Sequence, residues 1–164
     1  MRGAAPRIPK GSGRAVKKHE THPYTVMTVC TGNICRSPMG EIILRHEFEQ
    51  RGLGDAVRVE SSGVSDEEYG NPIDPRAVKV LRERGYAIPA KHFAHRITRN
   101  EIADTDLFLP MTASHMNALL HMLPLSKRSD VHMYRSFDPD LPDPQPGYES
   151  EIDLVDPWYG GPRE

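Results

Sequence analysis

Short apolar runs alternate with helical stretches along most of this chain, and this alternation is what most constrains its fold. The first run, 24–29, is β-branched and apolar, which predicts a buried strand. A polar loop follows, and Pro38 then stands where a proline suits the start of a helix that Gly52 closes. Strand, loop and helix in this order favour a parallel sheet with helices packed against it.

The same pattern recurs further along the chain. Asp74 and Pro75 are expected to open a second helix that Gly85 ends, and Thr112 can cap a third. Three more strands are predicted, over residues 57–61, 107–109 and 131–134. We therefore expect a single α/β domain, with a four-stranded parallel sheet and helices on both faces. In such sheets ligands bind beyond the carboxyl ends of the strands.

Charge divides the chain into a basic leader and an acidic body. Residues 1–22 hold six Lys or Arg side chains and one acid, although the whole chain carries a net charge of −2. The leader lacks the apolar run of a secretory signal, and no later stretch is long and apolar enough to span a membrane. We expect a disordered leader over 1–22 and a single folded domain over 23–164, located in the cytoplasm, without nucleic-acid or membrane partners.

Few residues in the chain suit a metal or a disulfide framework. His92 and His95 are close in sequence but lack Cys or carboxylate neighbours at metal-site spacing. Cys30 and Cys35 are too few for the disulfide framework of a secreted protein. We therefore expect no metal and no cofactor.

The loop after the first predicted strand has the composition of an anion site. It reads Cys30-Thr31-Gly32-Asn33-Ile34-Cys35-Arg36-Ser37-Pro38. A short loop that runs into a helix start directs backbone N–H groups and the helix dipole at one point. Gly32 lets the backbone approach a phosphate, and Asn33 tolerates the left-handed conformation such a loop needs. Arg36 adds a planar fork that matches two phosphate oxygens. We predict a phosphate-binding loop here.

Cys30 stands at the base of this predicted loop. The positive field of the site favours the thiolate form, which is placed for in-line attack on phosphorus. The alternative is a buried Cys30 that ends a strand, with Arg36 on an ordinary helix, and Cys-x5-Arg spacing alone leaves that alternative open. Four further residues of the loop speak against it: Gly32, Asn33, Ser37 and Pro38. A nucleotide P-loop is excluded, because no Gly-Lys-Ser/Thr follows.

These residues resemble the signature loop of the low-molecular-weight protein tyrosine phosphatases, which is Cys-x5-Arg-Ser-Pro after the first strand. The general acid of that family lies near the end of the chain in an Asp-Pro-Tyr-Tyr-Gly element, and this sequence has Asp156-Pro157-Trp158-Tyr159-Gly160. The resemblance runs from about residue 24 to residue 160. It implies a cofactor-free hydrolase that releases phosphate from phosphotyrosine-containing proteins.

The resemblance also implies roles for individual residues. Cys30 forms a cysteinyl-phosphate, Arg36 clamps the phosphate, and Asp156 protonates the leaving phenolate and then activates water. Ser37 is expected to donate its hydroxyl to the Cys30 sulfur. The rest of the implied site consists of the loop residues Thr31, Gly32, Asn33, Ile34 and Cys35, the supporting residues Ser61 and His92, and the cleft walls Trp158 and Tyr159. For Ser61 and His92, ordinary polar residues at strand ends remain the alternative.

Several positions bear on substrate and regulation. Family members that act on phosphoarginine carry Thr where this chain has Ile34, and an apolar side chain there favours a phosphotyrosine ring. Cys35 could form a disulfide with Cys30 or be small filler. Glu67 stands where relatives often place an aromatic residue, as a selectivity element or as part of a solvated loop. Residues 139–155 carry acids and no bases, and we expect a mobile loop that leads Asp156 into the site.

Other functions remain open at this point. The family continues with an amphipathic helix beyond the end of this chain, so a phosphate- or phosphopeptide-binding module without turnover is one alternative. A phosphoarginine phosphatase is a second. Arsenate reductase is a third, but it relays oxidation through further cysteines, and beyond Cys30 this chain has only Cys35.

Overall fold

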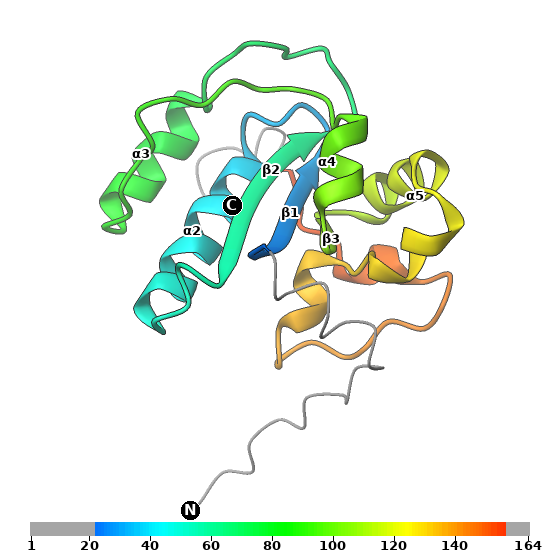
Figure 1. Cartoon of the computed structure of the whole chain (residues 1–164). Coiled ribbons are helices and arrows are strands. Elements are labelled where there is room, and N and C mark those ends of the chain that lie inside the picture. The colour runs from blue at the N-terminus through cyan, green and yellow to red at the C-terminus, as the bar shows by residue number, and fades with distance from the viewer. Residues whose placement is uncertain (1–21, 157–164) are drawn as a thin grey trace, which may run out of the picture.

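A computed structural model describes residues 22–156, and its centre is a parallel sheet of three strands (Figure 1). The strand order is β2-β1-β3, with β1 at Tyr24–Cys30, β2 at Val57–Gly63 and β3 at Leu107–Pro110. Both neighbours pair with β1 in parallel, so the carboxyl ends of all three strands lie at one edge of the sheet. The predicted leader lies outside the described residues, apart from residue 22.

Helices cover both faces of the sheet, as predicted. Figure 1 shows α2 (Arg36–Gln50) and α3 (Pro75–Glu83) on one side, and α4 (Arg99–Asp104) and α5 (Ala113–Met122) on the other. Three 3-10 helices follow, η1 (Leu125–Asp130), η2 (Tyr134–Phe137) and η3 (Glu149–Ile152). Within the described range, no helix is long and apolar enough to cross a membrane.

The central strand β1 is buried along nearly its whole length. Met27 and Val29 are fully buried in a cluster with Phe108 of β3 and Leu119 of α5. Successive side chains of a strand point to opposite faces, so the residues between them lie towards α2. There Thr28 donates its hydroxyl to the Ser37 carbonyl oxygen over 2.7 Å, which ties β1 to the first turn of α2.

The helix caps follow the sequence. The Asp74 carboxylate accepts the backbone N–H of Arg76 over 2.8 Å, and Pro75 occupies the first position of α3. Thr112 accepts the N–H of His115 over 3.2 Å at the start of α5. Both caps satisfy N–H groups that have no partner within the helix. Helix α4 was not predicted, although Thr98 and Glu101 form a capping box before it.

The predicted fourth strand over 131–134 is wrong. Only Val131 bridges β3, in parallel with Phe108, and the His132 N–H donates to the Phe108 carbonyl oxygen over 3.0 Å. The chain then turns into η2, where the Ser136 hydroxyl and N–H both donate to the Met133 carbonyl oxygen. A serine that bonds the preceding backbone favours such a turn over a strand ladder.

Gly63 ends β2 directly beside the loop that follows β1. A Cβ atom added there would lie 2.5 Å from the Thr31 carbonyl oxygen and 3.3 Å from the Asn33 backbone nitrogen. These neighbours are backbone atoms, which cannot rotate away as a side-chain tip can. The close approach of two backbones therefore requires glycine at this position.

We predict that Gly63→Ala lowers the free energy of unfolding by about 1–3 kcal/mol, because overpacking must displace the loop. Urea unfolding measures the change. Gly54→Ala is the matched control, since its Cβ would meet the flexible Glu49 side chain at 3.1 Å. That variant should stay within about 0.5 kcal/mol of the wild type. Equal effects of the two substitutions would contradict the backbone argument.

Candidate active site

The Cys30 side chain lies at the carboxyl end of β1, where it is buried. Its Sγ atom lies 3.0 Å from the Ser37 hydroxyl oxygen. Ser37 belongs to the first turn of α2, which begins at Arg36, two residues before the predicted start. At this position the backbone N–H groups of Arg36 and Ser37 have no partner within the helix, so they remain available to an anion.

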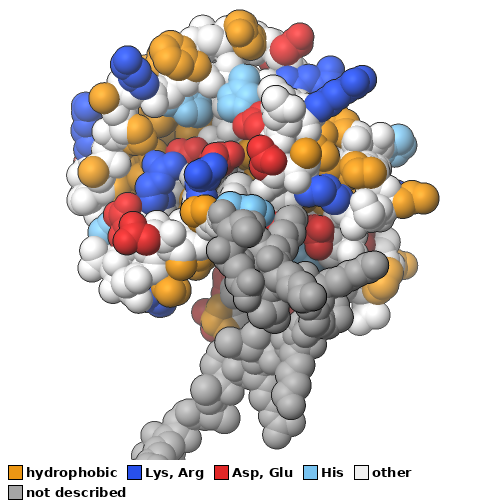
Figure 2. All heavy atoms as spheres, viewed as in Figure 1, with side chains coloured by type: hydrophobic (Ala, Val, Ile, Leu, Met, Phe, Trp, Pro, Cys, Tyr) orange, Lys and Arg blue, Asp and Glu red, His pale blue; other side chains and the backbone are white. Residues whose placement is uncertain are grey.

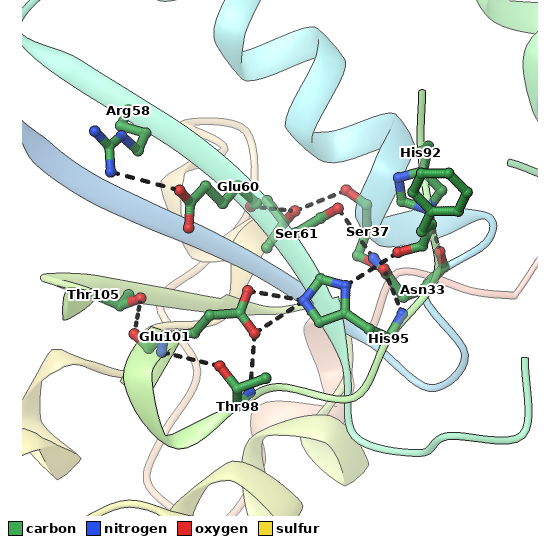
Figure 3. A network of polar contacts seen from close by, with 12 residues as sticks. Asn33, Ser37, Arg58, Glu60, Ser61, His92, His95, Thr98, Glu101 and Thr105 are labelled. Atoms are coloured by element: carbon green, nitrogen blue, oxygen red, sulfur yellow. Dashed lines mark hydrogen bonds and ion pairs between the residues drawn. The ribbon is translucent and has the colours of Figure 1, made fainter. Parts of the chain in front are cut away.

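A fully buried amide, that of Asn33, organises the loop (Figure 3). Asn33 has a φ of 60°, the left-handed conformation. Its Oδ1 accepts the backbone N–H of His95 over 3.2 Å, and this contact fixes which end of the amide is oxygen. The amide nitrogen then donates to the Ser37 and Ser61 hydroxyl oxygens over 2.9 and 3.0 Å. Because Ser37 accepts from Asn33, its own hydrogen is directed at the Cys30 sulfur.

Two histidines complete this network from outside the loop. The His92 ring, through Nε2, bonds the Asn33 carbonyl oxygen over 2.7 Å. The His95 ring bonds both carboxylate oxygens of Glu101, at 2.9 and 2.8 Å (Figure 3). The hydrogen bond to Glu101 raises the pKa of His95 above its ordinary value. Side chains from α4 and from the segment before it therefore hold the loop in place.

Arg36 and Asp156 face each other across the site. The Arg36 side chain is almost completely buried, and its Nη2 lies 3.4 Å from Oδ2 of Asp156. Its Nη1 donates to the Leu154 carbonyl oxygen over 3.0 Å. Asp156 is separated from Arg36 by 120 residues in sequence, so the fold brings two distant parts of the chain into contact.

A cavity of about 580 Å³ opens above the Cys30 sulfur. Most of the residues predicted for the site line it, and Asn33 lies fully buried beneath the loop. Ser61 and His92 line a different cavity. Trp158 and Tyr159 lie outside the described residues. The lining of the first cavity consists of Cys30, Thr31, Gly32, Ile34, Cys35, Arg36, Glu67, Glu68, Thr112, Ser114, His115, Asp153 and Asp156.

The two cysteines are both free in this structure, and they have different surroundings. Burial and the carboxylates of Asp74 and Asp156 raise the pKa of the Cys35 thiol to about 11. Cys35 is therefore a neutral thiol near pH 7, and it is a poor nucleophile there. Cys30 is the cysteine that the Ser37 hydroxyl contacts, and Cys30 and Arg36 line the same cavity.

Sequence reasoning did not find His115 or Asp153. His115 Nε2 lies 2.8 Å from the Thr31 hydroxyl oxygen, next to Cys30, and Asp153 accepts the N–H of Ala113 over 2.7 Å. Burial and the nearby Arg36 guanidinium lower the pKa of His115 to about 4. The local signal was weak: Thr112 predicted the helix that carries His115, but not the loop against which the histidine packs.

A second cavity, of about 520 Å³, is lined in part by Ser61, His92 and His95 of the Asn33 network. On the face that Figure 2 shows, acidic, basic and histidine side chains gather over the middle of the molecule. The lining includes Glu41, Arg45, Arg58, Glu60, His92, His95 and Glu101. Arg45 and Arg58 each lie within ion-pair distance of a carboxylate, at Glu41 and Glu60. Across residues 22–156, no group of three His, Cys, Asp or Glu residues is arranged to hold a metal ion.

A family comparison assigns the chain. The sequence model of the low molecular weight phosphotyrosine protein phosphatases matches residues 25–164. The chain belongs to this family. Within it, the low molecular weight protein-tyrosine phosphatase A of Mycobacterium tuberculosis is 41% identical over 138 residues, which are 84% of this chain and 78% of that protein. The low molecular weight protein-tyrosine-phosphatase of Streptomyces coelicolor is 36% identical over 84% of this chain and 80% of its own length.

Solved structures of related proteins share the fold of this low molecular weight phosphatase. The structure of YwlE arginine phosphatase, a Bacillus subtilis protein, superposes with a TM-score of 0.67 at 28% identity. The superposition covers 84% of this chain and 80% of that one.

We predict that His115 makes the free energy of unfolding depend on pH. Its pKa of about 4 in the folded state lies below the ordinary 6.5, so the unfolded chain binds the extra proton more readily between these values. As the pH falls from 6.5 towards 4, the wild type should lose up to about 1.4 kcal/mol of unfolding free energy per pH unit relative to His115→Asn. Urea unfolding at pH 7, 6 and 5 tests this.

The control is His121→Asn, since His121 is exposed on the same helix. This variant should follow the pH dependence of the wild type. A parallel decline of the wild type and His115→Asn would show that folding does not hold His115 in its neutral form.

Proposed function

We propose that this protein hydrolyses phosphotyrosine in proteins through a cysteinyl-phosphate, with Cys30 as nucleophile, Arg36 as phosphate clamp and Asp156 as general acid and base. The observation that carries the proposal is the convergence of these three residues on one cavity at the carboxyl end of β1. Membership of the family supports the reaction class. The substrate is a phosphoprotein, and the product is inorganic phosphate.

In the first step, the Cys30 sulfur attacks phosphorus and the bond from phosphorus to the tyrosyl oxygen breaks. Asp156, in its protonated form, gives its proton to the departing phenolate oxygen. The Ser37 hydroxyl lies 3.0 Å from the Cys30 sulfur and stabilises its negative charge before the attack. Arg36 and the N–H groups of the loop bind the equatorial oxygens, whose charge they match in the transition state.

In the second step, a water oxygen attacks phosphorus and the sulfur–phosphorus bond breaks. The Asp156 carboxylate takes the proton from this water, which restores the acid for the next cycle. Cys30 leaves as a thiolate, and the Ser37 hydroxyl again stabilises the sulfur. The chemistry requires only groups of the chain and water, and it needs Cys30 in its reduced form. We therefore infer a reducing compartment such as the cytoplasm.

Ile34 favours an aromatic phosphoester over phosphoarginine as the substrate. Its side chain lines the cavity beside the catalytic loop, where an apolar group can contact the flat face of a tyrosine ring. Phosphoarginine remains the second candidate, because YwlE arginine phosphatase shares the fold. By the family resemblance, Trp158 and Tyr159 are proposed to contact the aromatic ring of the substrate. A binding module without turnover explains the site less well than an enzyme does, since binding alone requires neither Cys30 nor Asp156.

We predict that the protein hydrolyses p-nitrophenyl phosphate in reductant and without metal, with a burst of one nitrophenolate per active site. Cys30→Ser should abolish turnover, because serine lacks an accessible anion near neutral pH. Asp156→Ala should lower the rate of phosphoryl transfer from phenyl phosphate, whose basic phenolate needs a proton, by about 10²–10⁴-fold, the usual contribution of a general acid or base. Stopped-flow absorbance measures the burst and the steady state.

Peptides that carry phosphotyrosine or phosphoarginine identify the substrate class in the same assay, through phosphate release. A higher kcat/KM for the phosphotyrosine peptide is the expected result, and Ile34→Thr should narrow the difference. Folded protein that binds phosphate without any turnover would overturn the enzyme proposal in favour of a binding module.

A further inference from the structure

We propose that Asp153 is a positioning residue that fixes the direction of the general acid Asp156 by docking its segment on helix α5. This inference rests on the proposed function, because it takes Asp156 as the acid. Asp153 is not assigned to substrate contact. It acts through the backbone between itself and Asp156.

The docking contact is a charged hydrogen bond at a helix start. Oδ1 of Asp153 accepts the backbone N–H of Ala113 over 2.7 Å, and Ala113 is the first residue of the ten-residue helix α5. That N–H has no partner within the helix, and a carboxylate there also faces the positive end of the helix dipole. Thr112 already serves the N–H of His115, so the two side chains divide the capping of this helix.

The backbone around Asp153 is held by three further contacts. The Asp153 carbonyl oxygen accepts Nη1 of Arg135 over 3.0 Å. The Leu154 N–H donates to the Met111 carbonyl oxygen over 2.8 Å, and the Leu154 carbonyl oxygen accepts Nη1 of Arg36 over 3.0 Å. On the other side, Ile152 is buried. The segment is therefore tied to β3, α5, η2 and the catalytic arginine, immediately before Asp156.

Helix α5 contacts the nucleophile loop as well as the acid segment. Its first residue holds Asp153, and its third residue, His115, bonds Thr31 beside Cys30. One helical turn thus sets the separation between the nucleophile and the acid. A displacement of a reacting group by about 1 Å can cost roughly 10²-fold in rate, so this contact bears directly on proton transfer.

The test is the dependence of kcat/KM on the leaving group. A functioning acid matters little for p-nitrophenyl phosphate, whose nitrophenolate is a weak base, and matters much for phenyl phosphate. We expect Asp153→Ala to lower kcat/KM for phenyl phosphate by about tenfold and to lower it much less for p-nitrophenyl phosphate. Asp153→Asn keeps an oxygen that can accept the Ala113 N–H, so it should retain most of the kcat/KM for phenyl phosphate that Asp153→Ala loses. Asp156→Ala removes the acid itself and therefore shows the largest loss of kcat/KM to expect for phenyl phosphate.

Further measurements separate positioning from unfolding. Urea unfolding and the rate of Cys30 alkylation by iodoacetate should show a folded protein with an intact nucleophile in Asp153→Ala. Arg135→Gln, which removes a different contact of the same segment, should change the leaving-group dependence in the same direction. Asp143→Ala alters an exposed carboxylate of the same segment, and it should behave as the wild type.

The outcomes are distinct. A uniform loss of kcat/KM for both substrates in Asp153→Ala and Arg135→Gln, or no loss at all, would overturn the positioning role while the wild type still turns over. Absence of turnover in the wild type itself would overturn the proposed function, and this inference with it.

Discussion

The loop that follows β1 depends on one buried amide. Asn33 adopts a left-handed backbone that few residues other than glycine tolerate, and its side chain donates and accepts at once. An unpaired buried amide would cost about 1–3 kcal/mol, so each partner helps to hold the loop in a single shape. The orientation of this amide in turn directs the Ser37 hydroxyl at the Cys30 sulfur. The direction of the hydrogen bond between Ser37 and Cys30 therefore depends on Asn33, a residue that does not line the cavity.

The sheet places Cys30 and the loop that follows it, and the neighbouring segments hold that loop rigid. Because β1 is the central strand, its carboxyl end is flanked by Gly63 of β2 on one side and by the Pro110–Met111 connection on the other. Cys30, the proposed nucleophile, therefore lies between two backbones rather than at an exposed edge of the sheet. Gly63 keeps the first of these close to the loop, and the Met111 backbone bonds both Val29 and Leu154. The proposed nucleophile and the backbone contacts that position it therefore lie together at the carboxyl ends of the three strands.

Sequence reasoning predicted the elements that local patterns determine. The apolar run before Cys30, the loop residues and the caps at Asp74 and Thr112 all leave a signature within a few positions. The strand expected at 131–134 was wrong because Ser136 turns the chain after a single bridge to Phe108. Short apolar runs fit either outcome, and periodicity alone does not decide between them.

The remaining site residues depend on contacts that no local pattern reports. Thr31 and His115 are 84 residues apart, Asn33 and His95 are 62 apart, and Ala113 and Asp153 are 40 apart. Each pair forms only when separate elements pack at the end of the sheet. The family resemblance supplied Cys30, Arg36 and Asp156, and also Ser37, Asn33, Ser61 and His92, but not His95, His115 or Asp153.

The contact between Arg36 and Asp156 has a consequence for how substrate enters. A phosphate dianion that binds the Arg36 guanidinium also comes close to the Asp156 carboxyl group, whose Oδ2 lies 3.4 Å from Arg36 Nη2, and like charges at close range repel each other. In the proposed mechanism Asp156 enters the first step as a neutral carboxyl group, which does not add that repulsion. Under the proposed mechanism, the form of Asp156 that can protonate the leaving group is therefore also the form that a phosphate dianion meets without repulsion.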